Sequence, residues 1–436
     1  NTVRMAYPAS SLPTFIPILV LLLVSIHKGF AVVPVSKTFK LVNNGGFSKY
    51  TAEFNSQYRA LPISAFPFRL CFFNTTPNAF TLAIGMGDLH SQFGIKWVWY
   101  ANRGRPVKDN AVLSLAQDGN LILRDSDGSI AWQTGTSSRN VAGLSLLSNG
   151  NLVLTDGNGN SVWQSFNFPT DSLLPGQYIF RDGRNKLTGR VSDKDGSEGP
   201  FSFQLENNHC SLFYTVKGKP LRYFKSSDTD SQETIANSTV TINQNNVDEN
   251  SYEIGMTGAN PFLSVTRPKF NATYSFLRME AAGNLAFYSF KEKVRTNAWE
   301  ITRRLFDRDD FISPGECQLP TKCGNLGVCS GNQCVGCPQQ QGFLGWRSSC
   351  SAPALPACGA PVNYYQVQVN VDHFLSGYND GVGPISLADC RGRCSKDCGC
   401  LGFFYNKNST RCFLAPILGS LIQVDDPDHV GFIKTS

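Results

Sequence analysis

Apolar and polar positions alternate in two stretches of the chain that align with each other without a gap. SLAQDGNLILRDSDGSIAWQ (114–133) matches SLLSNGNLVLTDGNGNSVWQ (145–164) at an offset of 31 residues. Each copy alternates through its Gly-Asn-Leu segment, turns at Asp127-Gly128 or Asn158-Gly159, and ends a second short run on a tryptophan. Alternation with a period of two is typical of half-buried strands, and Asp-Gly or Asn-Gly is typical of hairpin turns. The pattern therefore predicts a repeated β-hairpin.

A third, weaker copy of the hairpin precedes these two. It covers 80–84 and 97–103, and like the others it contains a tryptophan. A lone hairpin cannot bury its apolar face, so three hairpins whose tryptophans point at one axis predict a small threefold β-prism. We expect these tryptophans to be shared core rather than a stacking platform for a ligand.

The chain remains rich in strand-forming residues from 176 to 310. AAGNLAFYSF (281–290) and Trp299 are expected to form one repeat of a second prism whose other repeats have diverged. The polar segment 226–250 is expected to form loops that carry glycan. The clearest strand candidates in this region are 201–205, 211–216 and 276–279.

The cysteines are concentrated near the C-terminus. Only Cys71 and Cys210 of the 14 precede residue 317, and they are expected either to pair with each other or to stay free. Ser386-Leu387-Ala388-Asp389 is a capping-box pattern that opens a helix, with Cys390, Cys394 and Cys398 then recurring every four residues along one side. The expected disulfide cysteines are Cys317, Cys323, Cys329, Cys334, Cys337, Cys350, Cys358, Cys390, Cys394, Cys398, Cys400 and Cys412.

Residues 1–31 have the pattern of a cleaved secretion signal. Arg4 precedes an apolar run at 15–26, and the small residues Gly29 and Ala31 follow it. A membrane anchor is the alternative, but the run is shorter than the ~20 residues that a spanning helix needs. Without these residues 37 basic and 33 acidic residues remain, a balance too even to indicate nucleic acid binding. Four sequons support a secreted glycoprotein, with acceptors Asn74, Asn237, Asn271 and Asn408.

No catalytic residue, metal site or cofactor is expected. Cys334-Val335-Gly336-Cys337 has the spacing of zinc and redox sites, but it has no second CxxC at zinc-finger distance and no nearby histidine. An oxidising compartment favours disulfides instead. The histidines after residue 31 lie outside any nucleophile or metal motif, and the chain has no GxSxG, HExxH or P-loop. The sequence therefore predicts a binding protein, not an enzyme.

Several motifs resemble one plant family. WVWYANRGRPV (97–107), the DGNL and GNLVL strands and VWQSFNFPTDSLLPGQ (162–177) resemble the bulb-type, mannose-binding lectin domain of S-locus glycoproteins. GECQLPTKCGNLGVC (315–329) is similar to their EGF-like module. DHFLSGY, DCRGRCSKDCGCLGFFY and HVGFIKTS resemble the PAN/apple module in the subgroup of epidermis-specific secreted glycoproteins. Unlike the S-domain receptor kinases, the sequence shows no transmembrane helix or kinase after this module.

The resemblance implies a mainly all-β chain of tandem bulb-lectin β-prisms, a small disulfide-rich EGF-like module and an α+β PAN/apple module. It also implies the pairs Cys317–Cys329, Cys390–Cys412 and Cys394–Cys400, and an extracellular location in the cell wall or apoplast. The domain bounds expected are a signal peptide at 1–31, a lectin domain at 32–175, a degenerate second one at 176–312, the EGF-like module at 313–352 and the PAN domain at 353–436.

The family's sugar site is written Gln-x-Asp-x-Asn-x-Val-x-Tyr, and its named side chains share one face of a strand. At 116–124 this face carries Ala116, Asp118, Asn120, Ile122 and Arg124, all expected to point outward. Ala116 and Arg124 lack the hydrogen-bonding groups of Gln and Tyr, which predicts a site at least roughly tenfold weaker. The carbohydrate-binding candidates are Asp118, Asn120, Ile122 and Arg124, with Asn151 from the second copy and Asn284 and Tyr288 from the third.

Two functions are compatible with this sequence. The first is weak, multivalent binding of mannose-type glycans through the prism faces. The second is binding of an extracellular protein partner through the EGF-like and PAN modules, with the prisms as scaffold. In that case Gly allows close packing in each Gly-Asn-Leu strand and Asn makes turn-side hydrogen bonds. Neither function involves nucleic acid or a membrane anchor.

Overall fold

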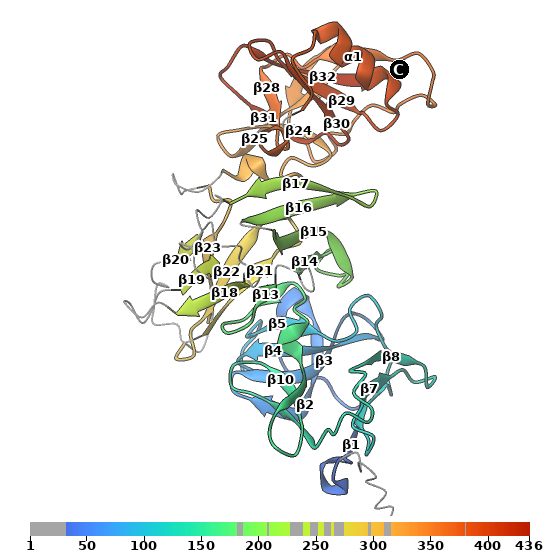
Figure 1. The fold of residues 1–436 in the computed structure, drawn as a ribbon, viewed down its shortest axis with the longest axis vertical. Coiled ribbons are helices and arrows are strands. Elements are labelled where there is room, and N and C mark those ends of the chain that lie inside the picture. Colours follow the sequence, from blue (N-terminus) through green and yellow to red (C-terminus); the bar gives the residue numbers. More distant parts are fainter. Residues whose placement is uncertain are drawn as a thin grey trace, which may run out of the picture.

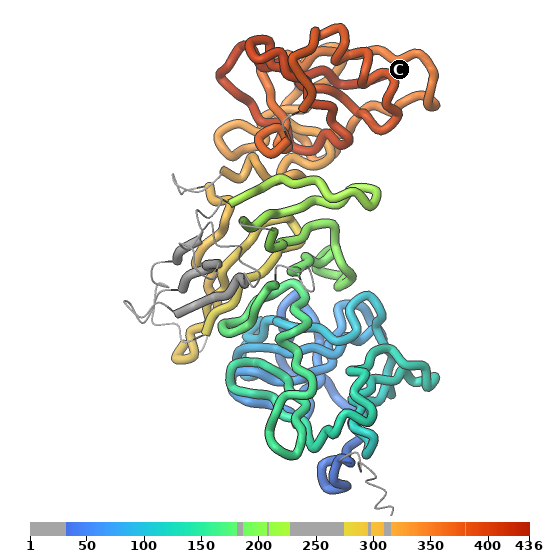
Figure 2. The backbone as a smooth tube through the Cα atoms, in the orientation of Figure 1, coloured from blue at the N-terminus to red at the C-terminus, as the bar shows by residue number. Residues whose placement is uncertain are grey.

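The computed structural model describes residues 32–180, 186–206, 209–226, 239–244, 252–256, 263–265, 274–294, 298–308, 315–379 and 381–436. The molecule is elongated, with three bodies stacked in sequence order (Figures 1 and 2). The expected signal peptide, 1–31, lies outside the described residues. Strands dominate the described part, as the sequence predicted.

The first body is a three-sheet prism built from the predicted hairpins. The copies at 114–133 and 145–164 each supply three antiparallel strands, and the weak copy supplies two strands of the third sheet. The sheets are β2 (Gln57–Ala65), β3 (Phe68–Thr76), β4 (Ala79–Gly87) and β5 (Ile95–Tyr100); β1 (Phe39–Val42), β6 (Val112–Leu115), β7 (Leu121–Arg124) and β8 (Ile130–Gln133); and β9 (Gly143–Leu146), β10 (Leu152–Thr155) and β11 (Ser161–Gln164).

One tryptophan from each sheet meets the other two at the prism axis. The ring centroids of Trp99, Trp132 and Trp163 lie 5.8, 6.1 and 5.7 Å apart, each pair edge to face. Leu121 and Leu123 of β7 are fully buried. The tryptophans meet in a shared core as expected, with Trp99 and Trp163 buried and Trp132 half-buried, and they join sheets that could not be stable singly.

The second body repeats the three-sheet plan with four strands in each sheet. β12 pairs with β21 although it lies in the range expected for the first lectin domain. The sheets are β12 (Ser172–Leu173), β21 (Tyr274–Met279), β22 (Leu285–Phe290) and β23 (Trp299–Arg304); β13 (Ile179–Phe180), β18 (Thr239–Gln244), β19 (Tyr252–Met256) and β20 (Leu263–Val265); and β14 (Leu187–Arg190), β15 (Glu198–Leu205), β16 (Cys210–Val216) and β17 (Lys219–Lys225).

The expectation of loops throughout 226–250 is wrong, because β18 lies within it. This strand pairs with β13 and β19. Four of its six residues are β-branched, a side-chain type that favours strands even in a polar segment: Thr239, Val240, Thr241 and Ile242. The strand candidates at 201–205, 211–216 and 276–279 lie in β15, β16 and β21, as expected.

The third body contains the expected EGF-like and PAN segments, which share one sheet. β24 of the first segment pairs in parallel with β31 of the second, with Val328 opposite Leu421. The shared sheet has β26 (Gly342–Gly345), β25 (Gln333–Gln339), β24 (Leu326–Ser330), β31 (Gly419–Gln423) and β28 (Val371–His373); the other sheet has β27 (Asn363–Gln366), β32 (His429–Thr435), β29 (Gly402–Asn406) and β30 (Arg411–Ala415).

Helix α1 (Leu387–Lys396) begins at the expected capping box. The Ser386 hydroxyl accepts a hydrogen bond from the Asp389 N–H at 3.1 Å. At the other end, the Lys434 ammonium donates to the carbonyls of Cys394 and Asp397. A cation suits these carbonyls because the helix C-terminus carries partial negative charge.

Six disulfides fix the third body. The three implied pairs are present, and both cysteines of the CxxC segment are bonded elsewhere, to Cys323 and Cys350. Cys398 lies beyond the end of α1, so the expected row of three helical cysteines contains only two. Of the two alternatives for Cys71 and Cys210, the structure has both free and buried. The disulfides are Cys317–Cys329, Cys323–Cys334, Cys337–Cys350, Cys358–Cys398, Cys390–Cys412 and Cys394–Cys400.

Two turn glycines of the same repeat allow the effect of backbone strain to be distinguished from the effect of crowding. Gly150 and Gly159 have φ angles of +88° and +85°, but a Cβ on Gly150 would lie 2.7 Å from the Phe68 ring and 2.9 Å from Leu174. Around Gly159 nothing lies within 4 Å. Both alanine variants carry the left-handed backbone cost, so Gly150→Ala should be less stable than Gly159→Ala by about 1–3 kcal/mol of overpacking. Denaturant unfolding measures this difference, and equal losses would contradict it.

Candidate functional site

The strand face at 116–124 presents three of its expected side chains to solvent. Asp118 and Arg124 are exposed and Ile122 is half-buried. The Asp118 carboxylate is held in place, because Oδ1 accepts from the Asn120 backbone N–H at 3.2 Å and Oδ2 accepts from the Ser137 hydroxyl at 2.9 Å. This surface therefore carries a positioned carboxylate and an apolar side chain close together in sequence.

Asn120 was expected to point outward, but it points inward, and only 5% of its surface is exposed. Its Nδ2 donates to Gln133 Oε1 at 3.0 Å, and its Oδ1 accepts from the Thr134 hydroxyl at 3.0 Å and the Thr136 N–H at 3.2 Å. The reason is local: the segment after β8 passes over the turn before β7, and its buried polar groups need partners. These bonds use the carbonyl and one amide hydrogen, leaving a ligand at most the second hydrogen.

The asparagine has the same internal role in the second and third copies. Asn151 donates to Gln164 Oε1 at 2.9 Å and accepts from the Phe166 N–H at 3.2 Å. Asn284 donates to the Phe306 carbonyl at 2.8 Å and accepts from the N–H of the same residue at 3.1 Å. In all three copies the amide therefore ties the Gly-Asn-Leu strand to a segment 13 to 22 residues further along the chain.

The candidate residues of the other two copies lie under neighbouring parts of the molecule. Val153, the counterpart of Ile122, is only 5% exposed. Tyr288 is 7% exposed, donates its hydroxyl proton to Glu280 Oε1 at 2.6 Å, and stacks on Phe276. Burial raises the pKa of Tyr288. The structure thus leaves the 116–124 copy as the accessible candidate among the three.

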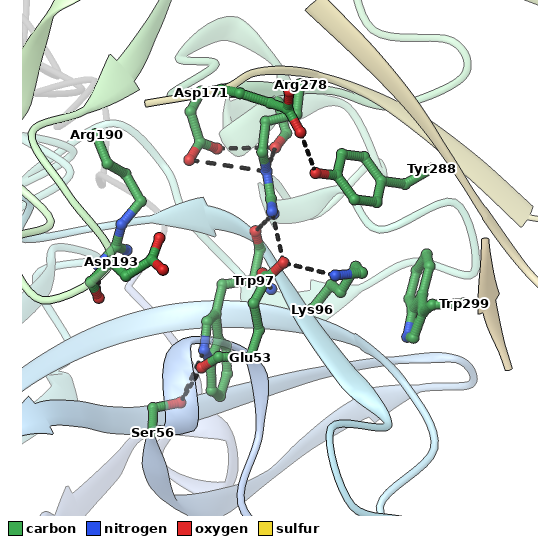
Figure 3. A network of polar contacts seen from close by, with 12 residues as sticks. Glu53, Ser56, Lys96, Trp97, Asp171, Arg190, Asp193, Arg278, Tyr288 and Trp299 are labelled. Carbon is green, nitrogen blue, oxygen red and sulfur yellow. Dashed lines mark hydrogen bonds and ion pairs between the residues drawn. The ribbon is translucent and has the colours of Figure 1, made fainter. Parts of the chain in front are cut away.

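The third copy is covered because the two prisms meet there through buried charged groups. Arg278 of β21 in the second prism points at Glu53 of the first (Figure 3), with 2.7 Å between Arg278 Nη1 and Glu53 Oε1. The Lys96 ammonium lies 2.8 Å from the same oxygen. Arg278 Nη2 also donates to the Trp97 carbonyl. We call Glu53, Lys96, Asp171 and Arg278 the inter-prism charge cluster.

The inter-prism charge cluster balances two acidic with two basic groups. Asp171 is fully buried, 3.9 Å from Arg278 Nε, and accepts from the Tyr100 hydroxyl at 3.2 Å. Burial alone would raise the pKa of Glu53, but the charges of Arg278 and Lys96 lower this pKa to about 2. Glu53 therefore stays ionised at neutral pH, and its ion pair with Arg278 holds the prisms together. No sequence pattern indicates it, because Glu53 and Arg278 are 225 residues apart.

The sequons occupy different environments. Asn408 is exposed in a turn, whereas Asn74 lies on β3 with 6% of its surface exposed. Asn237 and Asn271 lie outside the described residues. Glycosylation of these four asparagines remains a prediction.

Within the described ranges, no helix has both the length and the apolar character needed to cross a membrane. The same ranges contain no group of three His, Cys, Asp or Glu side chains that could hold a metal ion. The CxxC cysteines cannot offer thiolates while both are in disulfides.

Comparisons with known proteins identify two domain families and several relatives. The D-mannose binding lectin family matches residues 96–194, and the PAN domain family matches residues 362–423. "EP1-like glycoprotein 4" of Arabidopsis thaliana is 40% identical over 93% of each chain. "Epidermis-specific secreted glycoprotein EP1" of Daucus carota is 40% identical over 81% of this chain and 96% of its own. A monomeric monocot mannose-binding lectin from Gastrodia elata is 19% identical, covering 30% of this chain and 96% of its own with a TM-score of 0.18.

A bulb-type lectin prism, a second body of the same three-sheet plan and a disulfide-bonded PAN domain define a class of lectin-like glycoproteins. The chain belongs to the family of EP1-like, epidermis-specific secreted glycoproteins.

Proposed function

We propose that this chain is a secreted glycoprotein of the plant cell wall or apoplast that binds mannose-type glycans weakly through the 116–124 face. The observation that carries the proposal is the exposed Asp118 carboxylate, positioned by Asn120 and Ser137. A carboxylate of fixed orientation can accept hydrogen bonds from vicinal sugar hydroxyls, and Ile122 supplies an apolar contact beside it. The names of the relatives and the apolar pattern of residues 1–31 support secretion.

The same face explains why binding should be weak. Ala116 has no side-chain amide, and the Arg124 guanidinium donates to the Gly128 carbonyl at 3.1 Å. Asn120 uses most of its hydrogen-bonding groups in bonds within the protein. Each missing bond to a buried hydroxyl costs about 1 kcal/mol. We therefore propose useful retention only on multivalent surfaces, where linked sites raise the effective affinity.

Asp118→Ala should reduce retention on mannose-agarose at least roughly tenfold, since it removes the one exposed charged acceptor of the face. Asp127→Ala is the matched control: Asp127 is an exposed aspartate in the turn of the same hairpin, and its replacement should leave retention unchanged. Elution by free mannose at millimolar concentration provides the measurement. Failure of the wild-type protein to be retained would overturn the lectin function.

The second candidate function, binding of a protein partner through the third body, has its own supporting observation. The shared β24–β31 sheet joins the EGF-like and PAN segments into one unit that can present a single surface. The internal use of the asparagines also fits prisms that serve as scaffold. Two results together would favour this function. The full chain should show no sugar retention, and it should bind an extracellular protein through the surface formed by residues 315–436. Neither function requires catalysis or a cofactor.

A further inference from the structure

We propose a second carbohydrate site, which nothing in the mannose-binding motif indicates, in a depression between the tryptophan axis of the first prism and the second prism. Its ligand would be a pyranose ring of a neutral glycan, stacked on Phe168. This site is separate from the 116–124 face and goes beyond the function proposed above. We call it the Phe168 depression; it is lined by Trp132, Gln133, Phe168, Lys186 and Glu198, among others.

The Phe168 depression has the size and the lining of a small-ligand site. Its volume is about 550 Å³, within the usual range for ligand pockets. The base is aromatic, because Trp99, Trp132 and Trp163 meet there edge to face. Polar and charged side chains also line the depression. An apolar base with a few polar groups at the edge is the arrangement expected for an amphipathic ligand.

Phe168 is the exposed aromatic side chain on which a ligand could stack. It is 55% exposed, although burying a phenylalanine side chain is favourable. Its ring is stacked on Trp163 with 5.8 Å between centroids and 15° between planes. Its backbone is also fixed, since the Trp99 indole N–H donates to the Phe168 carbonyl at 2.9 Å. The ring is therefore held flat against the aromatic base with its outer face available for stacking.

Two charged side chains at the edge are available to hydroxyl groups. Lys186 and Glu198, both from the second prism, are exposed, and neither head group makes a hydrogen bond or ion pair with another described residue. Arg103 also lines the depression, but its Nε, Nη1 and Nη2 donate to the carbonyls of Gly196, Thr188 and Gly189. Arg103 therefore fixes the junction, while Lys186 and Glu198 remain to bind a ligand.

These features together select the ligand class. One face of a pyranose ring presents C–H groups and packs on an aromatic ring, whereas its hydroxyls at the edge both donate and accept hydrogen bonds. Lys186 can donate to such hydroxyls and Glu198 can accept from them. Lys186 and Glu198 offset each other in charge, and the further cation of the lining, Arg103, has its Nε, Nη1 and Nη2 donors turned to backbone carbonyls. The depression therefore offers no pair of free cations for a strongly anionic ligand, which favours a neutral one.

The test titrates the full-length protein with cellohexaose, mannohexaose and hexagalacturonate and follows the intrinsic tryptophan fluorescence. Three tryptophans form the base of the depression, so a stacked ligand should change their emission. At least one neutral hexamer should give a saturable response, and Phe168→Ala should weaken it about tenfold. Phe66→Ala is the matched control: Phe66 is 62% exposed, outside the depression, and its replacement should leave the response unchanged.

Further results decide the proposal. Phe168→Tyr, which keeps an aromatic face, should retain the response, and Asp118→Ala should also retain it even where mannose-agarose retention is lost. A response to hexagalacturonate alone would overturn the neutral ligand. Absence of any response in the wild-type protein, or equal responses in Phe168→Ala and Phe66→Ala, would overturn the site. Absence of mannose-agarose retention in the wild-type protein, with the fluorescence response still present, would overturn only the function proposed above.

Discussion

Replacing Arg278 with methionine is expected to lower the free energy of unfolding by about 3–5 kcal/mol. The substitution removes one of the two cations of the inter-prism charge cluster and leaves the buried carboxylates of Glu53 and Asp171 with Lys96 alone. It also deletes the donors to the Ser172 hydroxyl and the Trp97 carbonyl. An uncompensated buried charge costs far more than a lost contact, which is why this single position should have so large an effect.

The measurement is denaturant unfolding monitored by tryptophan fluorescence, with Arg304→Ala as the control. Arg304 lies on β23 of the same sheet, its side chain is 39% exposed, and it pairs with Glu280 at 3.5 Å. Its loss should cost no more than about 1 kcal/mol. The double variant Glu53→Gln with Arg278→Met restores the charge balance and should recover part of the loss. Similar losses in Arg278→Met and Arg304→Ala would show that the cluster does not hold the prisms together.

Acidification from pH 7 to pH 4 is expected to destabilise the third body through His373. Burial lowers the pKa of this histidine from 6.5 to about 4. Its ring lies among Phe374, Phe404 and Phe413, donates from Nε2 to the Ile417 carbonyl at 2.8 Å, and accepts at Nδ1 from the Leu375 N–H at 3.2 Å. Protonation of Nδ1 would break the second bond and place a charge among aromatic rings.

The sign follows from the two pKa values. Above pH 6.5 the histidine is neutral in both states and its full contribution is present. As the pH falls from 6.5 towards 4, the unfolded chain binds a proton that the folded chain does not, and about 3 kcal/mol of stability is lost. Glu53 is affected at lower pH, between its ordinary value of 4.5 and about 2.

Thermal unfolding at a series of pH values measures this loss. His373→Gln should flatten the profile between pH 6.5 and 4 while being less stable at pH 7, because the packing of the ring is gone. His90→Gln is the control, since the His90 side chain is 89% exposed. An unchanged profile in His373→Gln would mean that another group causes the acid sensitivity.

Local patterns allowed much of the fold to be predicted. The alternation and the Asp-Gly turns predicted β7 and β8, the capping box predicted the start of α1 at Leu387, and the threefold tryptophan core followed from the repeats. These features depend on residues that are close in sequence or repeated. Cys398 was placed on the helix by spacing alone, whereas the helix ends at Lys396. A four-residue spacing does not show where a helix ends.

The tertiary features could not be predicted in the same way. The burial of Tyr288 depends on the second prism docking on the first, and the ion pair that accompanies it joins residues 225 apart. The inward orientation of Asn120 depends on the return of the chain after β8, which supplies Thr134 and Thr136 as partners. Strand alternation correctly placed Leu121 and Leu123, but it cannot distinguish an asparagine that binds a ligand from one that binds its own backbone.

The parallel pairing of β24 with β31 sets an order of events during biosynthesis. Leu421 is synthesised 93 residues after its partner Val328, a delay on the order of ten seconds at typical translation rates. The disulfides Cys317–Cys329 and Cys323–Cys334 can close during that delay, because both partners of each lie within twelve residues. One edge of β24 has no strand beside it until the C-terminal segment emerges, and an unpaired edge is the part of a nascent chain most exposed to wrong association. A chain released before residue 419 would therefore carry these two disulfides but leave one edge of β24 without a paired strand.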